Sequence, residues 1–137
     1  MKIKSDFFIP CQSTVIDSET NSISLMNVID SISTKEPTQI TGVRFIGRLT
    51  VEDSSDDTEA ELEISLFSPN GKEQEVAEGN SKSYSVNIEP NTEIQRTGLI
   101  ADITFNAIES GPYTFRMTYG EEVLAEQTIF IEFNVSE

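Results

Sequence analysis

The sequence predicts an all-β domain in which two antiparallel sheets pack face to face as a β-sandwich. Short runs rich in β-branched and aromatic residues recur along the chain, and clusters of Gly, Pro, Asn, Asp and Ser separate them. Several runs alternate apolar and polar residues, and no long helical stripe is present. The 137 residues are enough to bury about two-thirds of the surface in one domain. We therefore expect a single domain over residues 1–137 with roughly eight or nine strands.

The first half of the chain predicts strands over residues 7–16, 22–29 and 42–52, with a turn over residues 17–21. Pro10 interrupts the first run, so we expect an edge or bulge there, because proline cannot donate a ladder hydrogen bond. The third run alternates clearly, and its core-facing set is Val43, Phe45, Gly47, Leu49 and Val51. The opposite face then carries Arg44, Ile46, Arg48, Thr50 and Glu52.

The second half predicts a half-buried strand over residues 60–67, whose outer face is acidic, and then a reversal at Ser68-Pro69-Asn70-Gly71. Residues 72–80 are polar with weak periodicity, which leaves open whether they form a strand. Further strands follow around Val86 and over residues 99–108. The chain should end in a hairpin that turns at Gly120 and continues over residues 123–135.

The segment from Glu109 to Phe115 reads Glu-Ser-Gly-Pro-Tyr-Thr-Phe. It resembles the Gly-x-Tyr start of the penultimate strand in immunoglobulin-like sandwiches, where a corner tyrosine bonds back to upstream backbone. The sandwich is therefore expected to be immunoglobulin-like or C2-like, and Tyr113 to be structural. The motif supports an architecture and carries no information about activity.

Composition and charge exclude several classes of function. The chain has no His, so it offers no Ser-His-Asp triad, no Cys-His pair and no imidazole ligand for a catalytic zinc. Its 24 acidic and 9 basic residues give a net charge of −15, which disfavours direct binding to nucleic acid or to an anionic membrane. Basic proteins and divalent cations would be attracted instead.

Cys11 is the single cysteine, so no intrachain disulfide forms, and its apolar neighbours predict a buried thiol in the core. The N-terminal residues contain no apolar signal segment, and no stretch approaches the length of a membrane-spanning helix. These features lead us to expect a cytoplasmic protein without a cofactor.

The chain also resembles an uncharacterised bacterial and phage family of small all-β proteins. The more specific part is an opening strand with Cys11, then Val-Ile-Asp at residues 15–17 and Asn-Ser-Ile-Ser-Leu-Met-Asn-Val-Ile-Asp at residues 21–30. The later features are a Pro-containing loop at Glu36-Pro37, an Arg-bearing strand from Arg44, a Pro-Asn-Gly turn and the Gly-x-Tyr-x-Phe hairpin. The resemblance implies a compact sandwich and supplies no catalytic or ligand residues.

Residues 52–59 form an acidic segment between two predicted strands, and they make a calcium site one hypothesis. Its candidate ligands are Asp53, Asp56, Asp57 and Glu59, with Asp17, Glu19 or Asp30 as a second source of oxygen ligands. The alternative is a solvated, mobile loop whose charges keep the edge from pairing with other chains. The spacing lacks the regularity of a dedicated calcium loop, which favours this alternative.

Arg44 and Arg48 lie four residues apart on one strand and so share a face, which makes them candidate partner-binding residues. The alternative is that they pair with cross-strand acids such as Glu61 or Glu63. A glycoside hydrolase would need paired carboxylates in a cleft, and nothing in the sequence indicates one.

The leading hypothesis is a non-enzymatic interaction or assembly module that presents loops or an edge strand to another protein or to copies of itself. One alternative is an acidic decoy that occupies the nucleic-acid site of a basic protein. A decoy needs its charges on one face, whereas the acids cluster at residues 52–63, 73–78 and 121–126. A calcium-dependent binding module is the other alternative.

Overall fold

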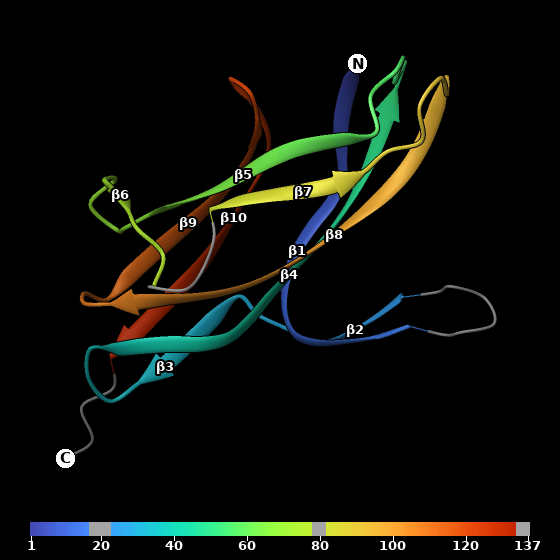
Figure 1. Ribbon diagram of the computed structural model, residues 1–137. Coiled ribbons are helices and arrows are strands. Elements are labelled where there is room, and N and C mark those ends of the chain that lie inside the picture. Colours follow the sequence, from blue (N-terminus) through green and yellow to red (C-terminus); the bar gives the residue numbers. More distant parts are fainter. Residues whose placement is uncertain (17–22, 78–81, 134–137) are drawn as a thin grey trace.

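A computed structural model describes residues 1–16, 23–77 and 82–133, and it confirms the predicted all-β sandwich. Ten strands are described in two sheets (Figure 1). The described residues include no helix long and apolar enough to cross a bilayer. The strands are β1 (Lys2–Ile16), β2 (Ile23–Val28), β3 (Ser31–Thr34), β4 (Thr38–Glu52), β5 (Glu59–Phe67), β6 (Glu73–Gln74), β7 (Ser83–Asn87), β8 (Ile94–Ala107), β9 (Gly111–Tyr119) and β10 (Glu122–Phe133).

The count exceeds the expected eight or nine because two short pieces also pair. The strand β3 pairs parallel with β10 in a sheet whose other pairs are antiparallel. The Asp30 carbonyl starts this pairing by accepting from the Phe130 N–H at 3.0 Å. The two-residue strand β6 pairs with β5 immediately after the predicted turn. Neither piece is long enough to show a period of two in the sequence.

The first sheet has the order β2-β1-β4-β8 and is antiparallel throughout. The prediction that Pro10 marks an edge or bulge is wrong, since β1 is paired on both sides and its bulge lies between Ser5 and Phe7. Pro10 is tolerated because it lies one residue beyond the last β1–β2 pair, Cys11 with Val28. The Pro10 nitrogen therefore faces the end of β2, where no residue needs a backbone hydrogen-bond donor from β1.

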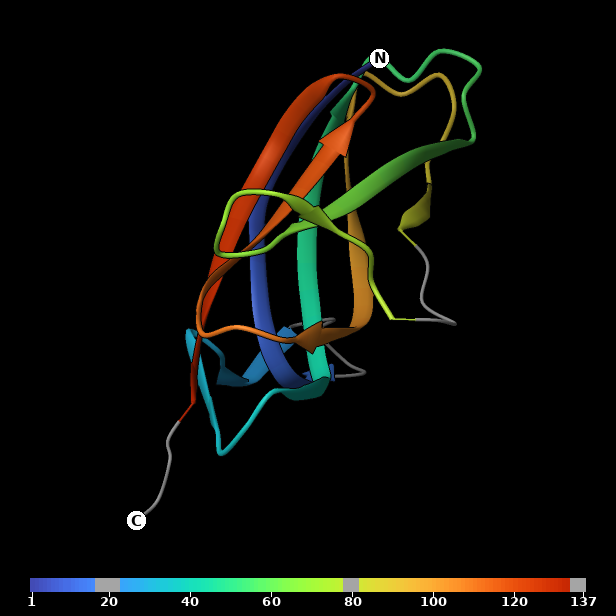
Figure 2. The same cartoon turned by 90° about the vertical axis from the view of Figure 1, so that its left-hand side faces the viewer.

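The second sheet has the order β3-β10-β9-β5-β6, and β7 also pairs with β5. The predicted reversal after β5 is confirmed, because the Gly71 N–H donates to the Ser68 carbonyl at 2.9 Å. The C-terminal hairpin of β9 and β10 is also confirmed. Figure 2 shows this sheet in front of β1, β4 and β8, so the two sheets form the layers of the sandwich.

The core lies between the sheets and is built from the alternating apolar residues of both. The inward residues of β4 predicted from alternation are buried, and Phe45 is at its centre. The Phe45 ring lies 4.7 Å from the ring of Phe8 and 4.7 Å from that of Phe115. Phe105 adds a further ring contact with Phe115 at 5.3 Å. Since Phe8 and Phe45 come from the first sheet and Phe115 from the second, this cluster joins the two layers.

The corner at Tyr113 is as predicted. The fully buried Tyr113 hydroxyl donates to the Glu109 carbonyl at 2.8 Å. The tyrosine therefore fixes the start of β9 and has a structural role.

Candidate functional site

The outer face of the four-stranded sheet carries an apolar patch. Directly opposite residues in an antiparallel pair project to the same side, and Ile9, Ile46 and Ile100 lie opposite one another on β1, β4 and β8. Ile46 is only 1% exposed although it lies outside the core between the sheets, whereas Ile100 is 50% exposed. We define the outer patch as Phe7, Ile9, Val28, Ile46 and Ile100.

Cys11 is buried, as predicted. It lies opposite Arg44, on the outer face of the sheet and not in the core between the sheets. The bulge between Ser5 and Phe7 explains this placement, because one extra residue reverses the alternation of everything that follows it on β1. The thiol therefore lies next to the outer patch.

Arg44 is engaged by Asp102, which lies directly opposite on β8. Its Nε donates to Asp102 Oδ1 at 2.7 Å and its Nη2 to Oδ2 at 3.1 Å. This paired hydrogen bond and the carboxylate charge raise the pKa of Arg44. The predicted partners Glu61 and Glu63 are wrong, because both lie on β5 in the other sheet. Sequence alternation shows which residues share a strand face, but not which strand is the neighbour.

Arg48 lies on the same face as Arg44, as predicted, between Phe7 on β1 and Gly98 on β8. It is partly buried. Within the described residues no carboxylate lies within ion-pair distance of Arg48, whereas five other basic residues each have one. Those five are Lys4, Arg44, Lys82, Arg96 and Arg116. Lys2, Lys35 and Lys72 likewise have no ion pair among the described residues, so the partner-binding role of Arg48 stays a prediction.

The acidic segment after β4 is hydrogen-bonded to the rest of the fold at its start, while residues 55–59 are exposed. Ser54 is fully buried, and its hydroxyl donates to the Glu89 carbonyl at 2.7 Å and accepts from the Thr92 N–H at 3.0 Å. The Asp53 N–H also donates to the Glu93 carbonyl at 3.0 Å. These bonds join the acidic segment to the loop between β7 and β8.

The calcium hypothesis stays a prediction. Its candidate ligands Asp53, Asp56, Asp57 and Glu59 all lie in or next to this anchored segment. Among the residues that the structure describes, no three His, Cys, Asp or Glu side chains are grouped to hold a metal ion. Of the candidate second sources, Asp17 and Glu19 lie outside the described residues. Asp30 precedes β3, and its backbone carbonyl already starts the β3–β10 pairing.

The anchor leads to a stability prediction. Replacing Ser54 with alanine leaves the Thr92 N–H without its partner and removes one of the two hydrogen bonds to the Glu89 carbonyl, the other coming from Gln95, which should cost about 1 to 3 kcal/mol of unfolding free energy. Urea denaturation of the variant measures this loss. Ser55→Ala, at the exposed neighbouring position, is the matched control and should change little. Equal stability of the two variants would contradict the anchoring role of Ser54.

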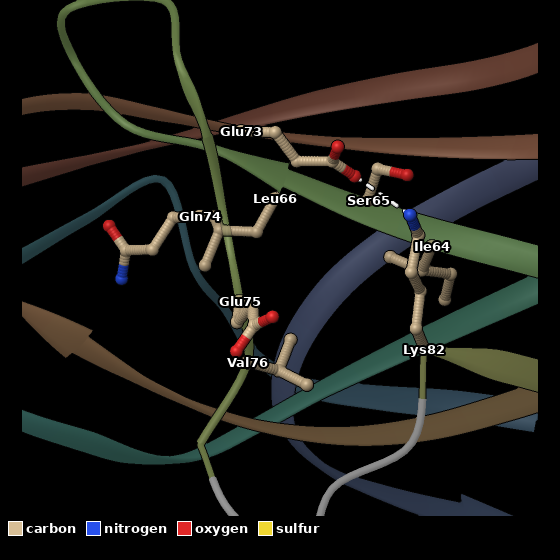
Figure 3. A pocket seen from close by; sticks show the side chains of 8 residues that line it. All are labelled: Ile64, Ser65, Leu66, Glu73, Gln74, Glu75, Val76 and Lys82. Carbon is tan, nitrogen blue, oxygen red and sulfur yellow. Dashed lines mark hydrogen bonds and ion pairs between the residues drawn. The ribbon is translucent and has the colours of Figure 1, made fainter.

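A cavity of about 480 Å³ lies beside β5, where the chain leaves β6 and returns to β7 (Figure 3). Ile64, Leu66 and Val76 contribute its apolar lining. At its rim, Lys82 Nζ lies 2.8 Å from Glu73 Oε1 and 3.9 Å from Glu63 Oε2. The sequence reasoning missed this site because residues 72–80 showed only weak periodicity.

The charged groups at the rim of this cavity shift each other's pKa values. The hydrogen bond from Lys82 lowers the pKa of Glu73, and the same bond raises the pKa of Lys82. Both shifts move the pKa values away from neutrality, whereas a general acid or base works best near the operating pH. Ser65 also forms a side-chain hydrogen bond with Glu73.

The two outer faces differ in charge. On the six-stranded sheet, Glu61 and Glu63 project outward from β5, and Lys82 brings Glu63 near Glu73. Glu126 joins the same face through its ion pair with Arg116, which lies opposite Ser65. Folding thus gathers acids from the three separate parts of the sequence. The outer face of the four-stranded sheet carries charges of both signs: Lys4, Arg44 and Arg96 pair there with Glu52, Asp102 and Asp6, and Arg48 lies on the same face.

Comparison with known proteins adds little to this description. No family model and no curated protein matches the sequence. Among solved structures, the chain is similar to an immunoglobulin-like protein from Pseudomonas aeruginosa, with 13% identity over 96% of this chain and 98% of that one and a TM-score of 0.38. The resemblance to a bacterial and phage family is therefore supported only in its all-β architecture, which the strands themselves show.

Proposed function

We propose that the protein is a non-enzymatic binding module that engages another protein through the outer face of its four-stranded sheet. The observation that carries the proposal is the outer patch, in which Val28 on β2 and Ile100 on β8 are at least half exposed on the face that also carries Arg48. Interface centres combine apolar side chains with arginine and exclude most other charges. An apolar patch of this kind on an otherwise highly charged surface is a sign of a binding site.

The patch also has the composition of a stable contact. Burying exposed Ile100 and Val28 contributes roughly 25 cal/mol per Å² of apolar surface removed from water. The side chain of Arg44 is already held by Asp102. Little conformational entropy is therefore lost when a partner binds beside it. Arg48 supplies a cation on the same face. An apolar partner surface with an acidic group placed to meet Arg48 would complement this face.

The test is a tagged pull-down from lysate of the source cell at low and high salt, with wild type and Ile100→Lys compared. We expect the wild type to retain a stoichiometric partner at high salt and Ile100→Lys to lose it, because a lysine in the patch opposes apolar contact. Val123→Lys is the matched control, since Val123 is 51% exposed on the other sheet. Retention of the partner by Ile100→Lys contradicts the proposal.

The acidic outer face of the six-stranded sheet favours a second candidate, the decoy of a nucleic-acid-binding protein. Exposed charge pairs are screened over about 8 to 10 Å at 0.1 to 0.15 M salt, so such a partner should be released as salt rises. If the protein is a decoy, the same pull-down should recover a basic partner. The Glu61→Lys variant should lose this partner, and the Ile100→Lys variant should retain it. Glu61 is exposed on β5, so the change should leave the fold intact.

A further inference from the structure

A second cavity, of about 390 Å³, lies between β3 and the first part of β4. The loop of residues 35–37 joins these two strands at the end of the sandwich opposite the N-terminus (Figure 1). The ladder between β1 and β4 ends at the pair of Cys11 with Arg44. Beyond that pair, residues 38–43 have β8 on one side and no strand of the described chain on the other. The cavity lies on this unpaired side of β4.

The cavity exists because β4 bends where its ladder with β1 ends. The register of β4 against β8 shifts between Ile40 and Val43, and Gly42 has φ +75°. A bulge of this kind bends the strand that contains it, and glycine adopts the positive φ without strain. A Cβ placed on Gly42 would find no atom within 4 Å, so the space beside the bend is empty of protein. The bend separates the first part of β4 from β1.

Gln39 directs its main-chain groups towards this space. On β8, the Asn106 carbonyl accepts from Gln74 Nε2 at 2.7 Å, and the Thr104 carbonyl accepts from the Ala77 N–H at 2.9 Å. The main-chain groups of these alternate β8 residues therefore point away from β4. Gln39 lies opposite Asn106, so the two residues form a pair without ladder hydrogen bonds. The N–H and C=O of Gln39 thus point away from β8, on the side where Gln39 lines the cavity.

Ser31 presents its main-chain groups in the same way from β3. The Phe130 N–H donates to the Asp30 carbonyl at 3.0 Å, and successive residues of a strand direct these groups to opposite sides. The N–H and C=O of Ser31 therefore point away from β10, and among the described residues β3 has no partner strand on that side. Ser31 also lines the cavity. The cavity thus lies between two strands that each present a main-chain donor and acceptor without a described partner.

The described lining of the cavity contains no charged side chain. It consists of four apolar residues, one glycine and six residues with hydroxyl or amide groups, although 24% of the chain is charged. The apolar residues are Ile29, Ile32, Ile40 and Val43. A charged group bound here would lose water without gaining an ion pair, which costs free energy. The lining therefore favours an uncharged ligand that forms hydrogen bonds.

The described residues that border the undescribed stretches lie away from this cavity. The cavity reaches β1 only at Gln12, whereas the pair that borders residues 17–22 is Ile16 with Ile23, about 13 Å further along β1. Ala77, which borders residues 78–81, lies on the side of β8 away from β4. Phe133, the last described residue, belongs to β10 on the other side of β3. No residue of the described chain occupies the cavity.

We propose that this cavity binds a short extended peptide segment with uncharged side chains, as an added strand between β3 and β4. An extended main chain presents its N–H and C=O groups alternately to its two sides. One residue of the segment therefore pairs with Ser31 and the next with Gln39. The inference goes beyond the proposed function, because the cavity shares no residue with the outer patch.

The test is a titration of the full ¹⁵N-labelled chain with the peptide acetyl-Thr-Val-Thr-Ser-amide, followed by NMR. We expect saturable shifts at the amides of residues 31–34 and 38–43. Replacing the valine of the peptide with lysine or with aspartate should weaken binding about tenfold in both cases, because the lining offers neither charge a partner. Weakening by lysine separates this site from a general attraction of cations to a chain of charge −15. Methylation of the valine nitrogen should weaken binding about fivefold, since it removes one main-chain donor.

Two variants at one position test the pairing from the side of the protein. Ser31→Pro removes the N–H of the first residue of β3, a place where strands tolerate proline, and it should weaken peptide binding about fivefold. Ser31→Ala keeps the N–H and is the matched control, which should bind as the wild type does. Ile100→Lys should also bind the peptide normally, so this test and that of the outer patch can fail separately. The proposal is overturned by an absence of saturable shifts, by shifts elsewhere, by equal binding of the charged peptides, or by equal shifts with the sugar trehalose.

Discussion

Replacing Phe45 with alanine is expected to lower the free energy of unfolding by about 3 to 5 kcal/mol. Phe45 is fully buried, and its ring contacts Phe8 of its own sheet and Phe115 of the other at 4.7 Å each. Removing it leaves a cavity that neighbouring rings cannot fill, because β4 is paired on both sides and its backbone cannot move inward. The substitution thus removes ring packing that joins the two sheets.

Equilibrium denaturation in urea measures this loss as a lower midpoint at unchanged slope. Phe130→Ala is the matched control: the same deletion is made on the outer face of β10, where Phe130 is 52% exposed. The Phe130→Ala variant should lose much less unfolding free energy than Phe45→Ala, because the Phe130 ring is already partly exposed to water. A similar loss for both variants would show that the cluster around Phe45 does not dominate the core.

The architecture could be predicted because alternation in a strand reports directly on which side is buried. The inward residues of β4 and β5 were identified in this way, and they form the observed core. Tyr113 was identified from its local motif, because a tyrosine corner depends only on residues close in sequence. These features need no knowledge of which strand lies beside which.

The features that could not be predicted concern residues whose neighbours are far away in the sequence. The partner of Arg44 is Asp102, 58 residues away, and no local pattern selects it over Glu61. The bulge between Ser5 and Phe7 moved Cys11 to the outer face, and a one-residue shift of this kind leaves no mark on composition. Ser54 reads as one more polar residue in an acidic loop, although its partners Glu89 and Thr92 make it a buried anchor.

The outer face of the four-stranded sheet could be predicted only in part, because it also depends on which strands are neighbours. A period of two places Arg44 and Arg48 together on β4, and the structure confirms that placement. The apolar neighbours of Arg48 come from β1 and β8, so the outer patch exists only after the strands pair. The place of β8 at the end of the four-stranded sheet likewise depends on strand order, because an edge is a property of the sheet and not of the strand.

Replacing Gly111 with alanine is expected to destabilise the fold by about 1 to 3 kcal/mol through backbone strain alone, and further through contact with Pro69. Gly111 has φ +133°, a region that residues with a side chain rarely adopt. A Cβ at this position would lie 2.9 Å from Pro69 Cβ and 3.1 Å from Pro69 Cγ. The substitution therefore strains the start of β9 and pushes it away from the turn after β5.

Two glycine variants separate these contributions. Gly71→Ala tests positive φ alone, since Gly71 has φ +84° and open space around its Cβ position. Gly98→Ala tests neither effect, because its nearest atom is 3.8 Å away and its φ is not positive. Thermal or urea unfolding should rank the losses Gly111→Ala, then Gly71→Ala, then Gly98→Ala. Pro69→Gly in the Gly111→Ala background should recover the contact part, because it removes both facing carbons. If it recovers nothing, backbone strain accounts for the whole loss and β9 does not depend on close packing against the turn.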